Sequence, residues 1–270
     1  MPTHSLLGLI EAKKSFLCVG LDLDPAKLPA GLKATPADML AFNRAIIEAT
    51  APYTVAYKIN TAFYEALGVA GWALLEQTRS LLPPGIYAIA DAKRGDIGNT
   101  ARQYARAFLT ELDFDALTVN PYMGIDTLEP YLLEPKGDIF VLACTSNPGF
   151  ADFEGLKTEK GTYLYEEVVL RSTVLGHGGR VHYVAGATRP EMLANVRKLA
   201  PGATLLVPGV GAQGGDLAAC FAAGYTATGP LLINASRSIL YAGSGADFAD
   251  LAAQEAAQMA KEMGVMLQSL

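Results

Sequence analysis

Residues 86–100 read IYAIADAKRGDIGNT, a stretch that predicts a buried strand ending in a group of charges. Its first five residues are apolar, which is typical of a strand covered on both faces in a parallel sheet. Because side chains alternate along a strand, we expect Asp91 and Lys93 to point the same way. A carboxylate and an ammonium at the end of a buried strand are costly to desolvate, and folded proteins often keep such pairs for chemistry.

A lone Asp-x-Lys pattern is more often a structural ion pair at the mouth of a sheet than a catalytic pair. Here Asp96 and Thr100 follow at close spacing, and Lys58 arrives from another apolar run. This combination favours a catalytic site over a structural ion pair.

Strand and helix candidates alternate along the whole chain. Strands are expected at residues 16–21, 55–59, 86–90, 116–119, 139–144, 181–185, 204–207 and 231–233, and helices at 36–50, 61–82, 100–112, 160–175, 190–199 and 215–223. Eight such units predict an α/β fold, a closed (β/α)8 TIM barrel of parallel strands. An open doubly wound sheet is the alternative, but no GxGxxG follows the first strand. With no linker or low-complexity segment, we expect a single TIM-barrel domain spanning residues 1–270.

The composition indicates a cytoplasmic enzyme. Hydrophobic residues make up 51% of the chain and charged residues 18%, which is enough for a large core. The formal net charge of -6 and the lack of a basic run argue against a nucleic-acid partner. The N-terminal segment lacks the order of a signal peptide, and no apolar stretch reaches the roughly 20 residues that span a membrane. We therefore expect neither a membrane nor a nucleic-acid partner.

The cysteines and histidines predict neither disulfides nor a metal site. Cys18, Cys144 and Cys220 are scattered and odd in number, which favours buried thiols in a reducing compartment. The three histidines show no metal-ligand spacing. His182 lies in a strand-like run, where a histidine that lines the core or a pocket is the expected role.

Polar residues follow most of the predicted strands. Asp22 follows the first strand, Lys58 and Asn60 share one face at the end of the second, Asn120 follows the fourth and Ser146 the fifth. Taken singly, Asp22 or Asn120 is more typical of a cap or turn residue. In a barrel, however, the carboxyl ends of the strands meet at one end, where active sites form. Several polar strand ends therefore predict a site there.

A glycine-rich turn, PGVGAQGGD at residues 208–216, follows the seventh predicted strand. Such a turn alone is often only a tight connection, but its glycines and the helix start behind it suit an anion. Barrel phosphates commonly bind after strands seven and eight. Arg237 follows the eighth strand. Alone it would be a solvated charge; beside this turn it is interpreted as half of a phosphate clamp.

Taken together, these motifs resemble the orotidine 5'-monophosphate decarboxylase family, in its longer, type 2 branch. GLDLDP, YKIN, DAKRGDIGNT, VNPYMG, TSNPG, GATRPE, PGVGAQGGD and NASRSI stand in the family's order over nearly the whole chain. The run Asp91-x-Lys93-x-x-Asp96-Ile97-x-x-Thr100 is the most specific of them. The resemblance implies a TIM-barrel carboxy-lyase that converts orotidine 5'-monophosphate to UMP and CO2, the last step of pyrimidine nucleotide synthesis, without metal or organic cofactor.

The resemblance also implies a role for each site residue. Lys58, Asp91, Lys93 and Asp96 would form a charged tetrad. Lys93 would protonate C6 of the pyrimidine, and Asp91 would lie near the substrate carboxylate, either to destabilise it or to orient Lys93. The implied substrate contacts are Asp22, Lys58 and Asn60 at the ribose hydroxyls or their neighbours, Ser146 or its neighbour Thr145 at the base, and Gln213 and Arg237 at the phosphate. Asp96, Ile97 and Thr100 would enter the partner subunit's active site, which implies a homodimer.

Two other functions stay open from the residues alone. A barrel lyase could use Lys58 or Lys93 as a Schiff base with a sugar phosphate, but acids that flank a lysine raise its pKa, which suits a proton donor better. Related sugar-acid phosphate decarboxylases carry a similar Asp-x-Lys-x-x-Asp pattern and use magnesium. A non-catalytic barrel that binds a phosphate or nucleotide is the third possibility, and it would not need the paired charges.

Overall fold

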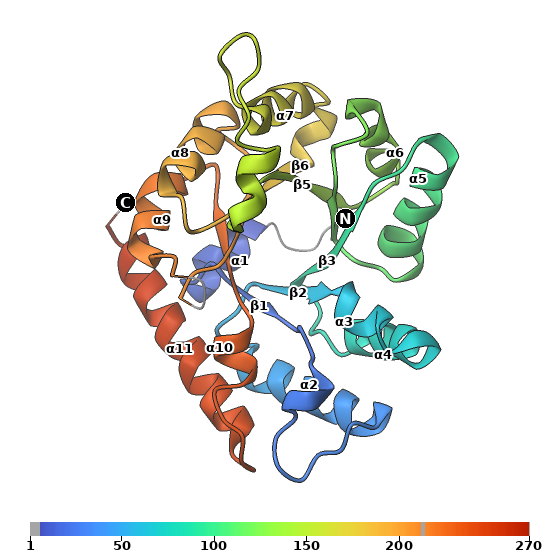
Figure 1. Ribbon diagram of the computed structural model, residues 1–270. Coiled ribbons are helices and arrows are strands. Elements are labelled where there is room, and N and C mark those ends of the chain that lie inside the picture. The colour runs from blue at the N-terminus through green and yellow to red at the C-terminus, as the bar shows by residue number, and fades with distance from the viewer. Residues whose placement is uncertain (1–5, 212–213, 270) are drawn as a thin grey trace. The chain divides into compact units, whose positions relative to one another are not determined.

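The computed structural model describes residues 6–211 and 214–269. Its strands are hydrogen-bonded in the order of a closed barrel, β1 to β8, and every strand pair whose register is resolved is parallel. The predicted α/β barrel is therefore confirmed. The strands are β1 (Leu17–Gly20), β2 (Ala56–Asn60), β3 (Tyr87–Arg94), β4 (Ala116–Val119), β5 (Asp138–Cys144), β6 (Val181–Ala185), β7 (Leu205–Pro208) and β8 (Leu231–Ala235) (Figure 1).

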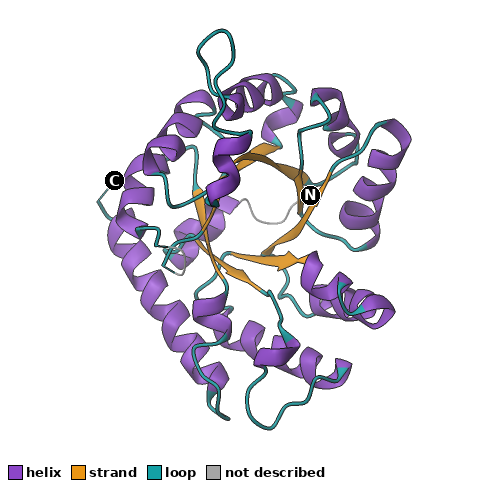
Figure 2. Ribbon diagram, in the orientation of Figure 1, coloured by secondary structure: helices purple, strands orange, loops and turns teal. Residues whose placement is uncertain are grey.

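Helices follow the strands along the chain, as Figure 2 shows. They are α1 (Leu6–Lys13), α2 (Pro36–Thr50), α3 (Thr61–Glu65), α4 (Gly68–Ser80), α5 (Gly98–Ala105), α6 (Glu129–Leu132), α7 (Leu164–Thr173), α8 (Pro190–Leu199), α9 (Leu217–Gly224), α10 (Arg237–Leu240) and α11 (Phe248–Leu267). Within the described residues, no helix is both long enough and apolar enough to cross a bilayer.

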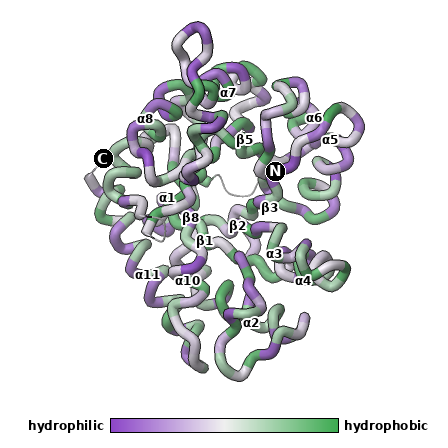
Figure 3. The backbone as a smooth tube through the Cα atoms, in the orientation of Figure 1, coloured by the Kyte–Doolittle hydropathy of each residue, from purple (hydrophilic) through white to green (hydrophobic). Residues whose placement is uncertain are grey.

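Contacts divide the chain into two compact units. The first comprises the described residues up to Asp91 and those from Asn234 onward, and the second runs from Ala92 to Ile233. In the first unit α11 packs against α2, with the ring of Phe248 stacked 5.3 Å from that of Phe42. Figure 3 shows hydrophobic and hydrophilic positions mixed along α11, as expected for a helix with one buried side.

The second unit contains the consecutive parallel pairs β4–β5, β5–β6 and β6–β7. Buried apolar residues fill these strands, which is typical of strands covered on both faces. Arg197 on α8 connects segments at the amino ends of β7 and β8, because its buried guanidinium donates hydrogen bonds to backbone carbonyls of five residues. Local order in this unit therefore depends on one polar side chain as well as on apolar burial.

The predicted helix at residues 61–82 is wrong as a single element. It divides into α3 and α4 at Gly68, whose φ of +64° is the left-handed conformation that ends many helices. The two helices then cross at Gly71, where an added Cβ would lie 1.7 Å from the carbonyl oxygen of Tyr64. A larger residue would not fit at this crossing.

Two other helices differ from the prediction at their ends. The helix expected at residues 100–112 begins at Gly98 and finishes as a π-helical turn, Arg106–Glu111. The helix expected at residues 160–175 is shorter, because Lys157 and Tyr163 form an antiparallel bridge before α7 begins at Leu164. The third strand is longer than expected and runs on to Arg94, so Asp91 and Lys93 both belong to β3.

Candidate active site

Lys58 is the centre of a buried charge cluster in the first unit. Its ammonium Nζ lies 2.9 Å from a carboxylate oxygen of Asp91 and 3.4 Å from one of Asp22. Only 4% of Lys58 and 8% of Asp91 is exposed. The register of β2 and β3 places Asn60 opposite Asp91, and alternation puts Lys58 on the same face as Asn60. The structure therefore brings Asp22, Lys58 and Asp91 together, from the ends of three strands.

The electrostatics of this cluster keep Lys58 charged. Burial by itself lowers the pKa of the lysine, but the carboxylates of Asp22 and Asp91 outweigh that effect and hold the pKa well above its ordinary value. A lysine must be neutral to attack a carbonyl group. The raised pKa of Lys58 therefore argues against a Schiff-base role for this residue and favours a fixed positive charge.

Tyr241 holds the turn that carries Asp22. Its hydroxyl accepts a hydrogen bond from the backbone N–H of Asp24 at 2.7 Å and donates one to the carbonyl of Asp22 at 3.2 Å. Burial raises the pKa of Tyr241 to about 12, so the hydroxyl keeps its proton at neutral pH. Tyr241 thereby fixes the position of one carboxylate that faces Lys58.

Asn60 has a local structural role at the end of β2. Its side-chain oxygen accepts the N–H of Ala62 at 3.2 Å and so caps α3. The cap fixes the orientation of the amide group opposite Asp91.

Lys93 lies two residues after Asp91 on β3, but in a different backbone conformation. Its φ of +49° is left-handed, which is rare for a residue with a side chain. The N–H of Lys93 donates to the hydroxyl of Thr118 on β4 at 2.9 Å, and its side chain is exposed. Side chains alternate between faces only where the backbone is extended. The prediction that Asp91 and Lys93 point the same way therefore does not follow for the left-handed Lys93. Strained conformations of this kind cluster at functional sites.

Asp96, Ile97 and Thr100 lie on the connection from β3 to α5. Gly95 packs closely on the end of β4, since an added Cβ would lie 2.9 Å from the carbonyl oxygen of Asn120. Asp96 accepts the N–H of Ile97 at 2.8 Å. Ile97 is 58% exposed, and Thr100, in the first turn of α5, is also exposed. The connection therefore presents an apolar side chain to solvent directly beside a carboxylate.

Thr145 and Ser146 follow β5, and the hydroxyl of Thr145 is already engaged. It lies 2.6 Å from the side-chain oxygen of Asn147 and 3.0 Å from both carboxylate oxygens of Glu154. One of these carboxylate oxygens, Oε2, also accepts the backbone N–H of Thr145 at 2.7 Å. Arg189, after β6, donates to the carbonyl of Thr145 at 2.8 Å. Ser146 is half-buried.

The glycine-rich turn hydrogen-bonds to itself. The N–H groups of Gly211, Gly214 and Gly215 donate to carbonyls within the turn. Asp216 caps α9 by accepting the N–H of Ala219 at 2.8 Å. These three N–H groups are therefore used within the chain. Gln213 lies outside the described residues.

Arg237 is the first residue of α10 and is exposed. The sequence predicts it at a helix start after the last strand, and this placement is confirmed. The residues before it are tightly packed, because a Cβ on Gly20 of β1 would lie 2.0 Å from the hydroxyl oxygen of Ser236.

Within residues 6–211 and 214–269, no group of three or more His, Cys, Asp or Glu side chains is placed to hold a metal ion. All three cysteines are free and buried; burial was predicted for Cys18 and Cys144. Burial raises the pKa of Cys18 and of Cys144 to about 12 and that of Cys220 to about 11. Their thiols are therefore poor nucleophiles at neutral pH.

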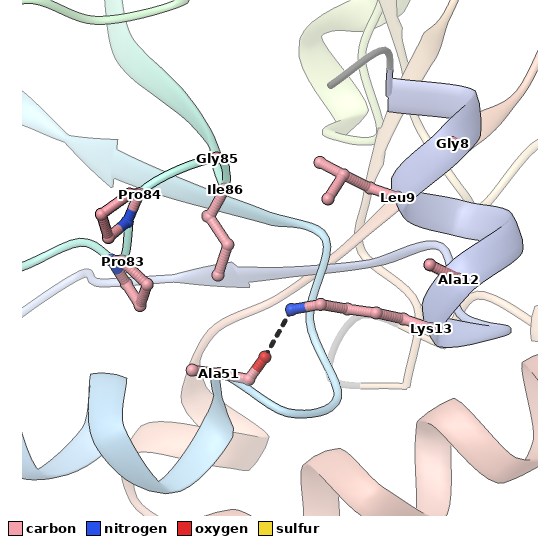
Figure 4. Close-up of a pocket in the computed structure, with 9 residues that line it drawn as sticks. All are labelled: Gly8, Leu9, Ala12, Lys13, Ala51, Pro83, Pro84, Gly85 and Ile86. Atoms are coloured by element: carbon pink, nitrogen blue, oxygen red, sulfur yellow. Dashed lines mark hydrogen bonds between the residues drawn. The ribbon is translucent and has the colours of Figure 1, made fainter. Parts of the chain in front are cut away.

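A cavity of about 320 Å³ lies in the first unit at the amino ends of the strands. It is lined by Gly8, Leu9, Ala12, Lys13, Ala51, Pro83, Pro84, Gly85 and Ile86 (Figure 4). Lys13 donates from one side of it to the carbonyls of Ala51 and Thr54, at 2.6 and 2.7 Å. None of the predicted site residues lines this cavity, so it is not the candidate active site.

Four residues that support the site are not among the sequence predictions: Thr118, Tyr241, Glu154 and Arg189. Thr118 gives a weak signal, as the one polar residue of an apolar four-residue strand. Arg189 lies in the GATRPE motif, although the motif alone does not reveal its contact. Tyr241 and Glu154 carry no signal, since their partners are set by tertiary structure.

Comparison with known proteins places the chain among decarboxylases. Residues 15–250 match the family model described as Orotidine 5'-phosphate decarboxylase / HUMPS family. A Flavobacterium johnsoniae protein named orotidine 5'-phosphate decarboxylase is 47% identical over 272 residues, covering 100% of this chain and 99% of that protein. A Dehalococcoides mccartyi protein of the same name is 50% identical over 250 residues, covering 91% of each chain.

Solved structures agree with this fold. The chain is similar to OMP decarboxylase of Leishmania donovani, with a TM-score of 0.83 and 36% identity over 97% of this chain and 98% of that one. It is also similar to a putative orotidine-monophosphate decarboxylase of Toxoplasma gondii, with a TM-score of 0.85 and 35% identity over 96% of each chain.

Proposed function

Because the chain belongs to the orotidine 5'-phosphate decarboxylase / HUMPS family, we propose that it decarboxylates orotidine 5'-monophosphate with Lys93 as the proton donor. The enzyme is a carboxy-lyase of pyrimidine synthesis, and its products are UMP and CO2. Relatives that cover nearly the whole chain at 47% and 48% identity carry this name. That likeness favours orotidine 5'-monophosphate over a sugar phosphate as the substrate.

The buried cluster of Asp22, Lys58 and Asp91 is the observation that carries the proposal. A barrel that only binds a phosphate has no use for a buried pair of opposite charges, Lys58 and Asp91, with the partly exposed carboxylate of Asp22 beside it. In the proposed reaction the bond between C6 and the carboxylate carbon breaks, and its electron pair stays on C6. Positive charge held in place near that carbon stabilises the transition state.

Lys93 then protonates C6, and water restores the proton to the lysine. Two features support this role: the left-handed backbone at Lys93 and the hydrogen bond that holds its N–H against Thr118. A strained conformation persists only where its surroundings enforce it, which is typical of residues fixed for catalysis. Asp91 either orients the lysine or disfavours the substrate carboxylate.

In the proposal, the substrate is bound by residues that come at the ends of the strands or after them in the sequence. Asp22 and Asn60 bind the ribose or its surroundings, and Ser146 binds the edge of the pyrimidine. Gln213 and Arg237 bind the phosphate. The exposed position of Arg237 at the start of α10 suits a guanidinium that meets a phosphate on ligand binding.

A homodimer with shared active sites is part of the proposal. Asp96, Ile97 and Thr100 of one subunit complete the site of the other. The support is the exposure of Ile97 beside the carboxylate of Asp96, since an exposed apolar side chain next to a charged one suits a surface that a second subunit covers. We place the enzyme in the cytoplasm, where pyrimidine synthesis and reduced thiols belong.

The function is tested by adding purified protein to orotidine 5'-monophosphate and following the loss of its absorbance. We expect turnover to UMP, and we expect the rate to be the same in excess EDTA. No turnover would overturn the proposal. Activity that disappears with the chelator and returns with magnesium would instead assign the chain to the metal-dependent relatives.

A further inference from the structure

The residue before Ser146 is held from both sides by charged side chains. Glu154 accepts the backbone N–H of Thr145 at 2.7 Å and lies 3.0 Å from its hydroxyl. Arg189 donates to the carbonyl of the same residue at 2.8 Å. Both backbone polar groups of Thr145 are therefore bound by side chains, one negative and one positive.

The two holding residues are themselves fixed. The guanidinium of Arg189 lies 4.4 Å from the ring centre of Phe150, which is buried. The carbonyl of Glu154 accepts the N–H of Tyr165 from α7 at 3.1 Å. The side chain of Arg189 and the backbone of Glu154 therefore each have a contact besides Thr145.

Ser146 has little room to move. An added Cβ on Gly186, after β6, would lie 2.8 Å from the backbone nitrogen of Ser146 and 3.0 Å from its Cβ. The segment around Ser146 thus lies directly on the end of β6. Its orientation depends on the peptide group that joins it to Thr145, whose carbonyl Arg189 binds.

We propose that Glu154 and Arg189 are positioning residues that orient Ser146 toward the pyrimidine base and so increase the enzyme's affinity for the base. The inference rests on the proposed function, in which Ser146 contacts the base. A binding group is effective only when its supporting residues hold it within a fraction of an ångström. Glu154 and Arg189 supply that support through their contacts with Thr145.

Comparing two ligands, one with the base and one without it, distinguishes a role in positioning Ser146 from a general role in stability. UMP carries the pyrimidine, whereas ribose 5-phosphate does not. The test variant is Glu154→Gln, which keeps the size of the side chain but replaces the charged acceptor of the Thr145 N–H with a neutral amide. The control is Glu159→Gln, an exposed position on the loop that precedes α7.

We expect Glu154→Gln to weaken UMP binding by about tenfold, the effect of one lost hydrogen bond, and to leave the Kd of ribose 5-phosphate unchanged within about twofold. KM for orotidine 5'-monophosphate should rise more than kcat falls. Glu159→Gln should match the wild type. Equal weakening of both ligands would show a general structural role, and unchanged UMP binding would show no role; either result overturns the proposal.

A double-substitution cycle with Ser146→Ala separates the inference from the function on which it rests. If Glu154 acts through Ser146, adding Glu154→Gln to Ser146→Ala should weaken UMP binding no further. If Ser146→Ala alone leaves UMP binding unchanged, the proposed contact to the base is wrong. If Ser146→Ala weakens binding and the two losses add in full, that contact stands and the positioning proposal fails.

Arg189 gives an independent test should Glu154→Gln fail to fold. Arg189→Met removes the donor to Thr145, whereas Arg189→Lys retains an N–H donor on a shorter reach. We expect UMP affinity to fall in Arg189→Met and to recover in part in Arg189→Lys, with ribose 5-phosphate unaffected in both. Loss of affinity for both ligands, or no loss for either, would contradict the proposal.

Discussion

Lys93 is held in a left-handed conformation by its neighbours, and its side chain is the proposed proton donor. Replacing it with alanine removes the proton and the positive charge near C6 together. We expect kcat to fall by more than the factor of about 10²–10⁴ typical of acid–base catalysis alone. UMP should still bind, because the product has no carboxylate to pair with the lysine. A Lys93→Ala enzyme that keeps about a tenth of the wild-type kcat, a barrier change of only about 1.4 kcal/mol, would rule out this role.

Lys58 differs from an ordinary ion-paired lysine, because its ammonium contacts two carboxylates, those of Asp22 and Asp91. Its pKa is raised in the folded protein, so its stabilising contribution is fully present below the ordinary lysine pKa of about 10.4 and is lost only as the pH rises beyond that value. Lys58→Met removes the ammonium that contacts the carboxylates of Asp22 and Asp91. We expect a loss of about 3–5 kcal/mol in the free energy of unfolding at neutral pH.

The pH dependence of that loss is the sharper measurement. Removing the ammonium of Lys58 is costly only while the carboxyl groups beside it are ionised, so the cost should shrink as the pH falls. Urea unfolding at pH 7.5 and pH 4.5 should show the gap between Lys58→Met and wild type narrowing at the lower pH. Lys27→Met, at an exposed pair with Asp24, should change stability by at most about 1 kcal/mol. A gap that stays constant with pH would contradict this account.

Arg197 stabilises elements rather than a site. From α8 it donates to the carbonyls of Ala200, Pro201, Ala203, Gly224 and Pro230, at 2.6–3.2 Å. These carbonyls belong to the end of α9 and to the segments that lead into β7 and β8. Burial lowers the pKa of Arg197 to about 10, which still leaves it charged at neutral pH.

We expect Arg197→Met to lower the free energy of unfolding by about 3 kcal/mol or more, because several buried carbonyls lose their donor at once. Arg171→Met is the matched control on α7, where the arginine is exposed and pairs with Glu167 one turn away. That control should cost less than about 1 kcal/mol. Urea unfolding of both variants measures the difference, and equal small effects would show that Arg197 is dispensable.

The strands could be predicted from the sequence because buried parallel strands are short, apolar and rich in β-branched residues. Residues 116–119 and 181–185 match β4 and β6 to the residue. The helix at residues 61–82 could not be divided, since the conformation of Gly68 depends on how α3 and α4 cross. The long helix α11 was not predicted, because three of its four buried residues are alanines, which mark a buried face less clearly than large apolar residues do.

The candidate site was predictable only in part, for a related reason. Polar residues at strand ends follow from alternation and from the barrel itself, which is why Asp22, Lys58 and Asp91 were expected together. The residues that hold them come from distant positions. Tyr241 reaches Asp24 from 217 residues away and Arg189 reaches Thr145 from 44, and no local pattern encodes such contacts.

The molecule as a whole is proposed to work as a dimer, and the β3–α5 connection is where that proposal can be tested. Asp91 and Lys93 lie on β3, whereas Asp96 lies beyond Gly95 on the connection. Ile97 beside it exposes 58% of its surface, more than an apolar residue needs to expose in a finished site. A subunit that lends Asp96 to its partner while keeping its own Lys93 has a distinct experimental signature.

Lys93→Ala and Asp96→Ala homodimers should each be nearly inactive, since every site in them lacks one of the two charges. In a mixed dimer one site combines both defects, whereas the other combines an intact Lys93 with an intact Asp96 from the opposite chain. Mixing and re-equilibrating the two inactive proteins should therefore restore activity, up to half that of wild type per dimer if the sites act independently. The heterodimer fraction is measured by mass spectrometry alongside the rate. If heterodimers form and activity stays at the level of the separate variants, Asp96 serves its own subunit and the shared site is wrong.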